Sequence, residues 1–183
     1  MARKTSLREF QQNVAQRLRE LAGRKTSASK LGFQVGAENW LVNLTDVSEV
    51  IPVPAIAAVP LTQPWFRGVA NVRGKLYSIA DLARLHGGEA TGPGMDRRVI
   101  LISDRLVEGS GLLVSRMLGL RNPDQFTRDN TVAPLVPWAG SCLRDQSGAT
   151  WFELDLPKLA ASAAFLEVGS SAPRETVAPS QDF

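Results

Sequence analysis

Glycine and proline divide the chain between residues 31 and 154 into short apolar runs. The 183 residues include 15 Gly and 11 Pro. Runs such as "LGFQV" and "RVILIS" have the length of a strand and are too short for an ordinary helix. Because glycine and proline interrupt helices and favour turns, we predict a mainly β fold of short strands joined by tight turns.

The first part of this region predicts a series of strands. Residues 31–44 are expected to form two strands joined by a turn at 36–39, and residues 47–53 form a third, which two prolines close. Three prolines in residues 54–65 indicate a connecting loop. Residues 68–79 then predict two more strands, with Arg73 and Gly74 at the turn between them.

Later segments continue this pattern. Asp81 is a good N-cap residue and is expected to start a short helix that ends before Gly87. Residues 98–103 predict a buried strand, and residues 109–120 one or two more. Residues 150–156 predict a last strand, followed by a helix over "PKLAASAAFLEV" with proline in its first turn.

Two parts of the chain have a similar apolar pattern at an offset of 70 residues. Four apolar positions coincide: Val42, Leu44, Val47 and Val50 fall on Leu112, Val114, Met117 and Leu120. We interpret this weak repeat as an indication of two similar β lobes.

Residues 1–30 differ from the rest. Apolar residues recur there at steps of three and four and predict an amphipathic helix over residues 5–22, with the stripe Leu7, Phe10, Val14, Leu18 and Leu21. Residues 23–30 have the composition of a linker. The segment carries eight Lys or Arg against two Glu, so the basic net charge of +3 originates there. The polar tail 169–183 is expected to be disordered.

The sequence predicts a cytoplasmic protein that does not insert into a membrane. No apolar run approaches the roughly 18 residues of a membrane span. The basic residues Arg3 and Lys4 are followed by a polar, helical stretch and not by the apolar core of a signal peptide. The single cysteine, Cys142, agrees with a reducing compartment.

Catalytic, metal and cofactor sites are not indicated. The only histidine, His86, is placed to close a short helix. Cys142 has no activating base at a suggestive spacing, and a set of several cysteines that could bind a metal is excluded. Glu153 and Asp155 share a face of the predicted strand, and this face can equally be a solvent-exposed one without catalytic function. The loop glycines at 92 and 94 do not make a phosphate-binding motif. We therefore expect a non-enzymatic protein without cofactor or metal.

A small β-barrel protein that binds nucleic acid is the alternative. Arginine supplies 16 of the 21 basic residues. However, the four tryptophans do not lie among basic clusters, and the β region itself is neutral to acidic. Binding to nucleic acid is therefore not the preferred interpretation.

The segment "GVANVRGKLYSIADL" resembles the characteristic segment of CheW-like coupling domains, which reads close to G-V-x-N-L-R-G, a strand and D-L. The similarity extends over residues 31–168 and includes "LGFQVGAENWLVNLTDVSEVI" and "TWFELDLPKLA". The resemblance implies two SH3-like, five-stranded β-barrel lobes around a shared hydrophobic core, with an N-terminal and a C-terminal helix outside them.

The resemblance also implies a function. Such a domain is a scaffold that couples the cytoplasmic tip of methyl-accepting chemoreceptors to the regulatory domain of a CheA-type histidine kinase. Three features are similar to the twitching-motility, PilI-type branch, which serves type IV pili. They are the basic N-terminal helix, the motif "GVANVRG" and the loop "PLTQPW". A module for another receptor system, or a split part of a kinase, stays open.

The family pattern further implies which residues bind the partner. The acidic residue of "VSEV" is Glu49 and the arginine of "NVRG" is Arg73, and in this family the matching residues lie together and support receptor contact. Val47 is expected to line the groove that faces the receptor, and Val72 and Gly74 flank the arginine. A guanidinium can bind a carboxylate with two hydrogen bonds and still offer donors to a partner.

Overall fold

The structure is a computed structural model that describes residues 29–134 and 136–169. The amphipathic helix predicted over 5–22 and the tail predicted to be disordered lie outside these residues. The division into a segment 1–30, a domain 31–168 and a tail stays a prediction, although the first strand begins at Lys30.

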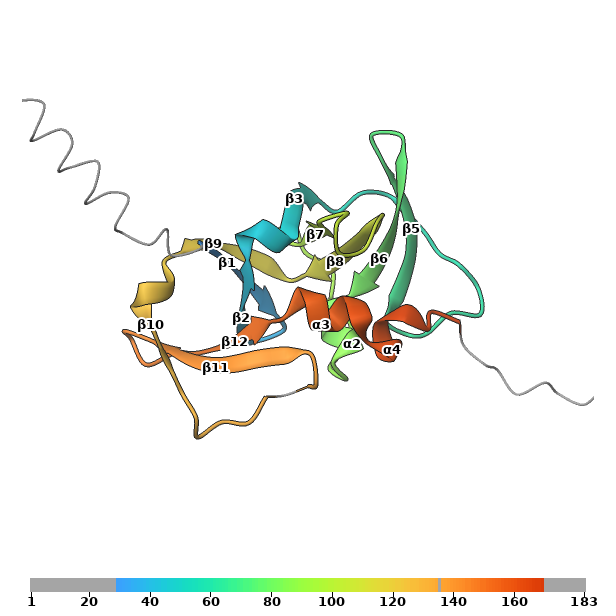
Figure 1. The fold of residues 1–183 in the computed structure, drawn as a ribbon. Coiled ribbons are helices and arrows are strands. Elements are labelled where there is room, and N and C mark those ends of the chain that lie inside the picture. Colours follow the sequence, from blue (N-terminus) through green and yellow to red (C-terminus); the bar gives the residue numbers. More distant parts are fainter. Residues whose placement is uncertain (1–28, 135, 170–183) are drawn as a thin grey trace, which may run out of the picture.

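The described residues form two six-stranded sheets (Figure 1). The sheet that we call lobe A has the order β10-β11-β12-β2-β1-β9. Its strands are β1 (Lys30–Val35), β2 (Glu38–Asn43), β9 (Arg116–Arg121), β10 (Phe126–Arg128), β11 (Ala139–Asp145) and β12 (Thr150–Leu154). Lobe B has the order β3-β7-β8-β6-β5-β4. Its strands are β3 (Val47–Pro52), β4 (Ile56–Ala57), β5 (Phe66–Val72), β6 (Lys75–Asp81), β7 (Arg98–Ile102) and β8 (Ser110–Val114).

The two lobes have the same topology. Lobe A from β10 to β9 corresponds strand by strand to lobe B from β4 to β3. In each lobe one central pair is parallel, β12 with β2 and β6 with β8, and the other pairs are antiparallel. The offset of 70 residues places β2 on β8 and β3 on β9, which are equivalent strands. The prediction of a mainly β fold with two similar lobes is confirmed.

The lobes are not the two halves of the sequence. Lobe B uses one continuous stretch, from β3 to β8. Lobe A consists of β9 to β12 and is completed by β1 and β2 from the start of the described chain. The pairing of Trp40 with Phe152 therefore joins segments that are far apart in sequence.

Three details of the prediction were wrong. Each sheet has six strands and not five. The segment 54–65 is not only a loop, because Ile56 pairs with Ala70 and so adds the edge strand β4. Gly68 permits this close approach: it has φ +126, and a Cβ there would lie 2.1 Å from the carbonyl oxygen of Ala57.

The C-terminal helix is also divided, into α3 (Leu156–Ala161) and α4 (Ala163–Leu166). Ser162 separates them with extended dihedral angles of −80° and 135°. Its hydroxyl donates to the carbonyl of Leu159 at 2.8 Å and so competes with the helical hydrogen bonds.

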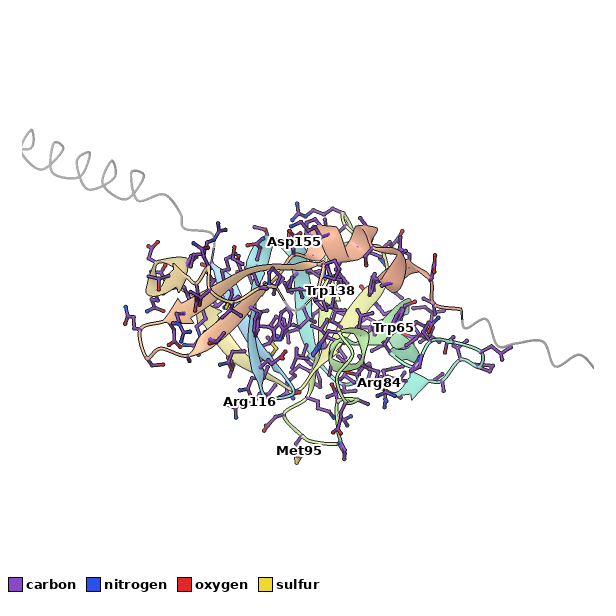
Figure 2. All side chains as sticks on the ribbon, turned by 90° about the horizontal axis from the view of Figure 1, so that it is seen from below. Trp65, Arg84, Met95, Arg116, Trp138 and Asp155 are labelled. Atoms are coloured by element: carbon purple, nitrogen blue, oxygen red, sulfur yellow. The ribbon has the colours of Figure 1, made fainter. Side chains whose placement is uncertain are left out.

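One hydrophobic core lies between the lobes. Trp40 from lobe A is fully buried and packs on Trp138, with ring centroids 5.8 Å apart. Ile100 and Leu112 from lobe B belong to the same cluster. Figure 2 shows Trp138 in the middle of the molecule and Met95 at its periphery. Because both sheets bury one face in this core, the two lobes hold each other in place.

Each parallel pair leads into a helix that begins at an aspartate. Asp81 caps α2 (Leu82–Leu85), as the sequence predicts, and Asp155 caps α3. Asp81 is fully buried and also accepts two 2.8 Å hydrogen bonds from the backbone and hydroxyl groups of Thr91. Asp155 is partly exposed and accepts one from Lys158 N–H at 3.0 Å.

This difference predicts unequal costs for the same substitution. Asp81→Ala should lower the free energy of unfolding by about 2–4 kcal/mol, because it removes a cap and leaves buried donors of Thr91 unpaired. Asp155→Ala should cost only about 1 kcal/mol. Urea denaturation of both variants measures the two costs. Equal losses would contradict the structural role of buried Asp81.

Candidate functional site

The turn between β5 and β6 is the centre of the candidate site. This hairpin is the green loop that projects beyond the rest of lobe B in Figure 1. Arg73 and Gly74 have positive φ values of 54° and 86°, and Val72 pairs with Lys75. These features are those of a two-residue type I′ turn. The side chain of Asn71 accepts a 2.8 Å hydrogen bond from Gly74 N–H and stabilises the turn.

Arg73 occupies a backbone conformation that is unusual for its residue type. Asn, Asp and Gly are preferred at the first position of a type I′ turn, whereas a long side chain at positive φ is disfavoured by roughly 1 kcal/mol. A glycine is present only at the second position. The strain at Arg73 is therefore not explained by stability and points to a role for its side chain.

The guanidinium of Arg73 binds the carboxylate of Glu49 on β3. Its Nη1 and Nη2 atoms donate to Oε2 and Oε1 over 2.8 Å and 2.7 Å. These hydrogen bonds, and secondarily the charge of Glu49, raise the pKa of Arg73 further above its usual value. The predicted pair is thus present in the structure. The Arg73 side chain is 75% exposed and that of Glu49 is 38% exposed, so the pair remains accessible.

The pair joins two elements that are not neighbours in the sheet. Glu49 lies on the edge strand β3, and Arg73 lies at the tip of the β5–β6 hairpin. Lobe B must curve to bring them within hydrogen-bond distance. The pair therefore fixes the position of the hairpin tip relative to β3.

Of the other predicted site residues, Val72 and Gly74 flank Arg73, and Val47 is the first residue of β3. Val47 is half-buried and packs on the shared core, and Val72 is half-buried on the cluster inside lobe B. Both valines contribute to packing and keep part of their surface free. Gly74 is exposed, with no atom near the position of a Cβ.

A second charged cluster at the hairpin has no signal in the sequence. Lys75 donates to Asp104 at 2.7 Å and lies 3.3 Å from a carboxylate oxygen of Glu108. The hydrogen bond raises the pKa of Lys75 and lowers that of Asp104. The partners are far apart in sequence, so no spacing rule connects them. The next residue, Leu76, is 65% exposed and adds an apolar side chain to the hairpin surface.

The equivalent hairpin of lobe A is built differently. Its turn contains Ser147 and Gly148, and Gly148 has φ +85. Asp145 accepts hydrogen bonds from Ser147 and from Trp151 Nε1, which lower its pKa to about 2. The carboxylate is thus used inside the hairpin. Only lobe B presents an exposed arginine–glutamate pair at this position of the fold.

The residues that the sequence analysis weighed for catalysis take part in packing, capping or ion pairs. His86 ends α2, with its ring 6.0 Å from that of Trp40 and its Nε2 3.7 Å from Glu38. Cys142 is buried, and burial raises the pKa of its thiol. Glu153 accepts a 2.8 Å hydrogen bond from Lys30, so it is not paired with a second carboxylate.

Residues 29–134 and 136–169 contain neither a metal-binding cluster nor a membrane-spanning helix. These residues contain no group of three or more His, Cys, Asp or Glu side chains arranged to hold a metal ion. Within the same ranges, every helix is too short or too polar to cross a membrane.

The strained turn generates a test of stability. Gly74→Ala should cost about 1 kcal/mol, because an alanine at φ +86 is strained although space is available. Arg73→Asn should change the free energy of unfolding by less than about 0.5 kcal/mol, since the loss of an exposed ion pair is offset by a residue that tolerates positive φ. Chemical denaturation measures both changes. A larger loss for Arg73→Asn would make the arginine a stability residue.

Burial of Cys142 predicts low reactivity. At mildly alkaline pH the native protein should react with iodoacetamide many times more slowly than the urea-unfolded chain, because the raised pKa leaves little thiolate. Mass spectrometry of the alkylated protein measures the two rates. Equal rates would contradict the buried position of this thiol.

Comparisons with known proteins agree with this architecture. Protein PilI of Pseudomonas aeruginosa is 32% identical over 109 residues, which cover 60% of this chain and 61% of PilI. The match therefore spans about three fifths of the length of that relative.

The crystal structure of the scaffolding protein TtCheW from Thermoanaerobacter tengcongensis has the same fold. It superposes with a TM-score of 0.60 over 70% of this chain and 89% of its own, at 19% identity. The family model of the CheW-like domain matches residues 30–164, from the first strand to α4. This chain belongs to the CheW-like domain family.

Proposed function

We propose that this protein is a non-enzymatic scaffold that couples methyl-accepting chemoreceptors to a CheA-type histidine kinase. Membership of the CheW-like domain family supports this role, and the similarity to PilI supports its place in the chemosensory system of type IV pili and twitching motility. The protein acts in the cytoplasm, at membrane-associated chemosensory arrays. It needs neither cofactor nor metal for this work.

The observation that carries the proposal is the exposed pair of Arg73 and Glu49. Two of the five N–H donors of the guanidinium bind Glu49, and three are left for a partner. Glu49 holds the guanidinium plane in one orientation, so less side-chain freedom is lost when a partner binds. An exposed pair contributes little to stability, about 0.2–1 kcal/mol, and its value is in positioning.

The pair lies among residues that suit a protein partner. Val47 and Val72 keep part of their apolar surface free, and Leu76 adds a strongly exposed side chain on the same hairpin. Charged donors beside apolar side chains are typical of binding surfaces on proteins. We assign contact with the receptor tip to Glu49, Arg73, Val47, Val72 and Gly74. The regulatory domain of the kinase binds another surface of lobe B.

The tryptophans argue against nucleic acid as the ligand. Proteins that bind single strands stack bases on exposed aromatic rings. Here Trp40, Trp65, Trp138 and Trp151 are all buried, at 9% exposure or less. The described lobes therefore lack a tryptophan platform for bases.

Charge reversal at the hairpin tests the proposal. Arg73→Glu places two carboxylates together and should reduce capture of a chemoreceptor fragment at least about tenfold in a pull-down, while a CheA-type kinase fragment is still captured. The double variant Glu49→Arg with Arg73→Glu restores an ion pair and should recover part of the binding. Isothermal titration calorimetry gives the affinities.

Arg144→Glu is the matched control. The Arg144 side chain is also exposed, at 47%, and it pairs with the largely covered carboxylate of Asp129 at 2.8 Å, but it lies in lobe A. It should leave receptor capture unchanged. Unchanged capture by Arg73→Glu, with an unchanged melting temperature, would return Arg73 to the role of a turn residue. Equal losses for Arg73→Glu and Arg144→Glu would assign the effect to general electrostatics.

A further inference from the structure

Apolar side chains are exposed where the described chain begins. Ser29 accepts a 3.1 Å hydrogen bond from the backbone N–H of Leu44, and Leu44 is 40% exposed. Two residues further on, Leu31 pairs with Leu120 of β9, which is 64% exposed. Val47 follows Leu44 after one 3-10 turn and is half-buried. We call Leu44, Val47 and Leu120 the entry patch.

Packing of the described residues does not account for this exposure. Residues opposite each other on antiparallel strands share a face, so Leu120 is on the side of the sheet where Leu31 is buried in the shared core. The equivalent residue of lobe B, Val50, packs against that core. Leu120 has the same position in the fold and remains largely uncovered. β9 is also an edge strand of lobe A, with no partner beyond it in the described chain.

The sequence of the preceding segment has an apolar pattern that would suit this patch. Leu7, Phe10, Val14, Leu18 and Leu21 recur at steps of three and four, so a helix over residues 5–22 would carry them on one side. An isolated helix of this length is marginal in water and is stabilised mainly by packing its apolar face. A helix over these residues would therefore need a surface on which to pack.

The connection makes the entry patch the nearest surface for this segment. Only residues 23–28 lie between its end and Ser29, and an extended chain spans about 3.4 Å per residue. The linker thus reaches about 20 Å, which is enough for the chain to reverse direction and lay the segment on the entry patch. A helix of 18 residues is about 27 Å long, which is sufficient to cover β9 and the start of β3.

We propose that residues 5–22 of this chain pack as an amphipathic helix on the entry patch and shield it. Val47 belongs both to the entry patch and to the residues assigned to receptor contact, so the docked helix covers part of that contact surface. The helix then competes with any partner of that surface. This last consequence rests on the proposed function, whereas the docking itself does not.

Paramagnetic relaxation in the full-length protein tests the docking. A nitroxide is attached through Gln12→Cys, which is on the polar side of the predicted helix, and buried Cys142 is expected to stay unlabelled. The methyl signals of Leu44, Val47 and Leu120 should be broadened. Those of Leu76 and Leu166, which are exposed elsewhere on the molecule, should stay sharp.

Matched variants distinguish docking from chance proximity. Leu18→Ser removes an apolar contact and should restore the signals of the entry patch, whereas Gln16→Ser on the polar side should not. A label attached through Ser180→Cys, in the tail, should leave the entry patch unaffected. Absence of selective broadening with the label at position 12 would overturn the proposal.

Other occupants give different results. The spin-labelled chain is mixed with an isotopically labelled chain that carries no nitroxide. Broadening of the entry patch in this mixture would make a second copy the occupant and would also overturn the proposal. A third outcome is that no broadening occurs in solution and the segment binds anionic vesicles. This outcome would assign the helix to a membrane surface and would also overturn the proposal.

Competition with the receptor is measured separately. If the helix covers the patch most of the time, Leu18→Ser should raise the affinity for a receptor fragment about 3- to 10-fold, and Gln16→Ser should not change it. An unchanged affinity in the presence of the expected broadening would overturn the competition alone. If no variant binds the receptor fragment, the proposed function fails and the docking result still stands.

Discussion

The shared hydrophobic core is the interaction on which the rest of the structure depends. Trp40 and Trp138 enter it from lobe A, and Ile100 and Leu112 enter it from lobe B. Within the described residues each sheet covers this face of the other, so the two lobes stabilise each other. The core also fixes β3, because Val47 and Val50 pack on it. The position of Glu49 between these valines is thus a consequence of packing far from the surface.

Equivalent positions of the two lobes carry side chains with different roles. Both lobes have a projecting hairpin with a glycine at positive φ, and both continue into a helix capped by aspartate. In lobe A the polar groups of the hairpin are used internally, around Asp145. In lobe B the ion pair links Arg73 to an edge strand and stays accessible. The duplicated architecture supplies the frame, and a few side chains decide which copy presents a binding surface.

Much of the fold was predictable from local chemistry. The turns at Gly36 and Gly74, the cap at Asp81 and the strand at 98–102 follow from residue preferences that act over a few positions. The added strand β4 was missed because its pairing with β5 depends on Gly68, whose role is visible only in three dimensions. The break at Ser162 was missed because serine is compatible with both a helix and a local hydrogen bond.

At the candidate site, the contact between Arg73 and Glu49 was expected from the family pattern. The spacing of these two residues in the sequence does not indicate it. No pattern in the sequence predicts the pairing of Lys75 with Asp104. The exposure of Leu120 depends on the edge position of β9, and that of Leu76 on its place near the tip of the β5–β6 hairpin. Sequence therefore predicted the residues that act locally, and long-range contacts required the fold.

The division of lobe A between the two ends of the chain affects the order of events during synthesis on the ribosome. β1 and β2 are made first, but β12, which pairs with β2, follows only after all of lobe B. Lobe B is continuous and can form its strand pairs as soon as β8 has emerged. Until β12 is made, the edge of β2 that pairs with it has no neighbouring strand, and a chain interrupted before that point would expose this edge to aggregation. The last of the described strands to be made is therefore the one that completes the sheet of lobe A.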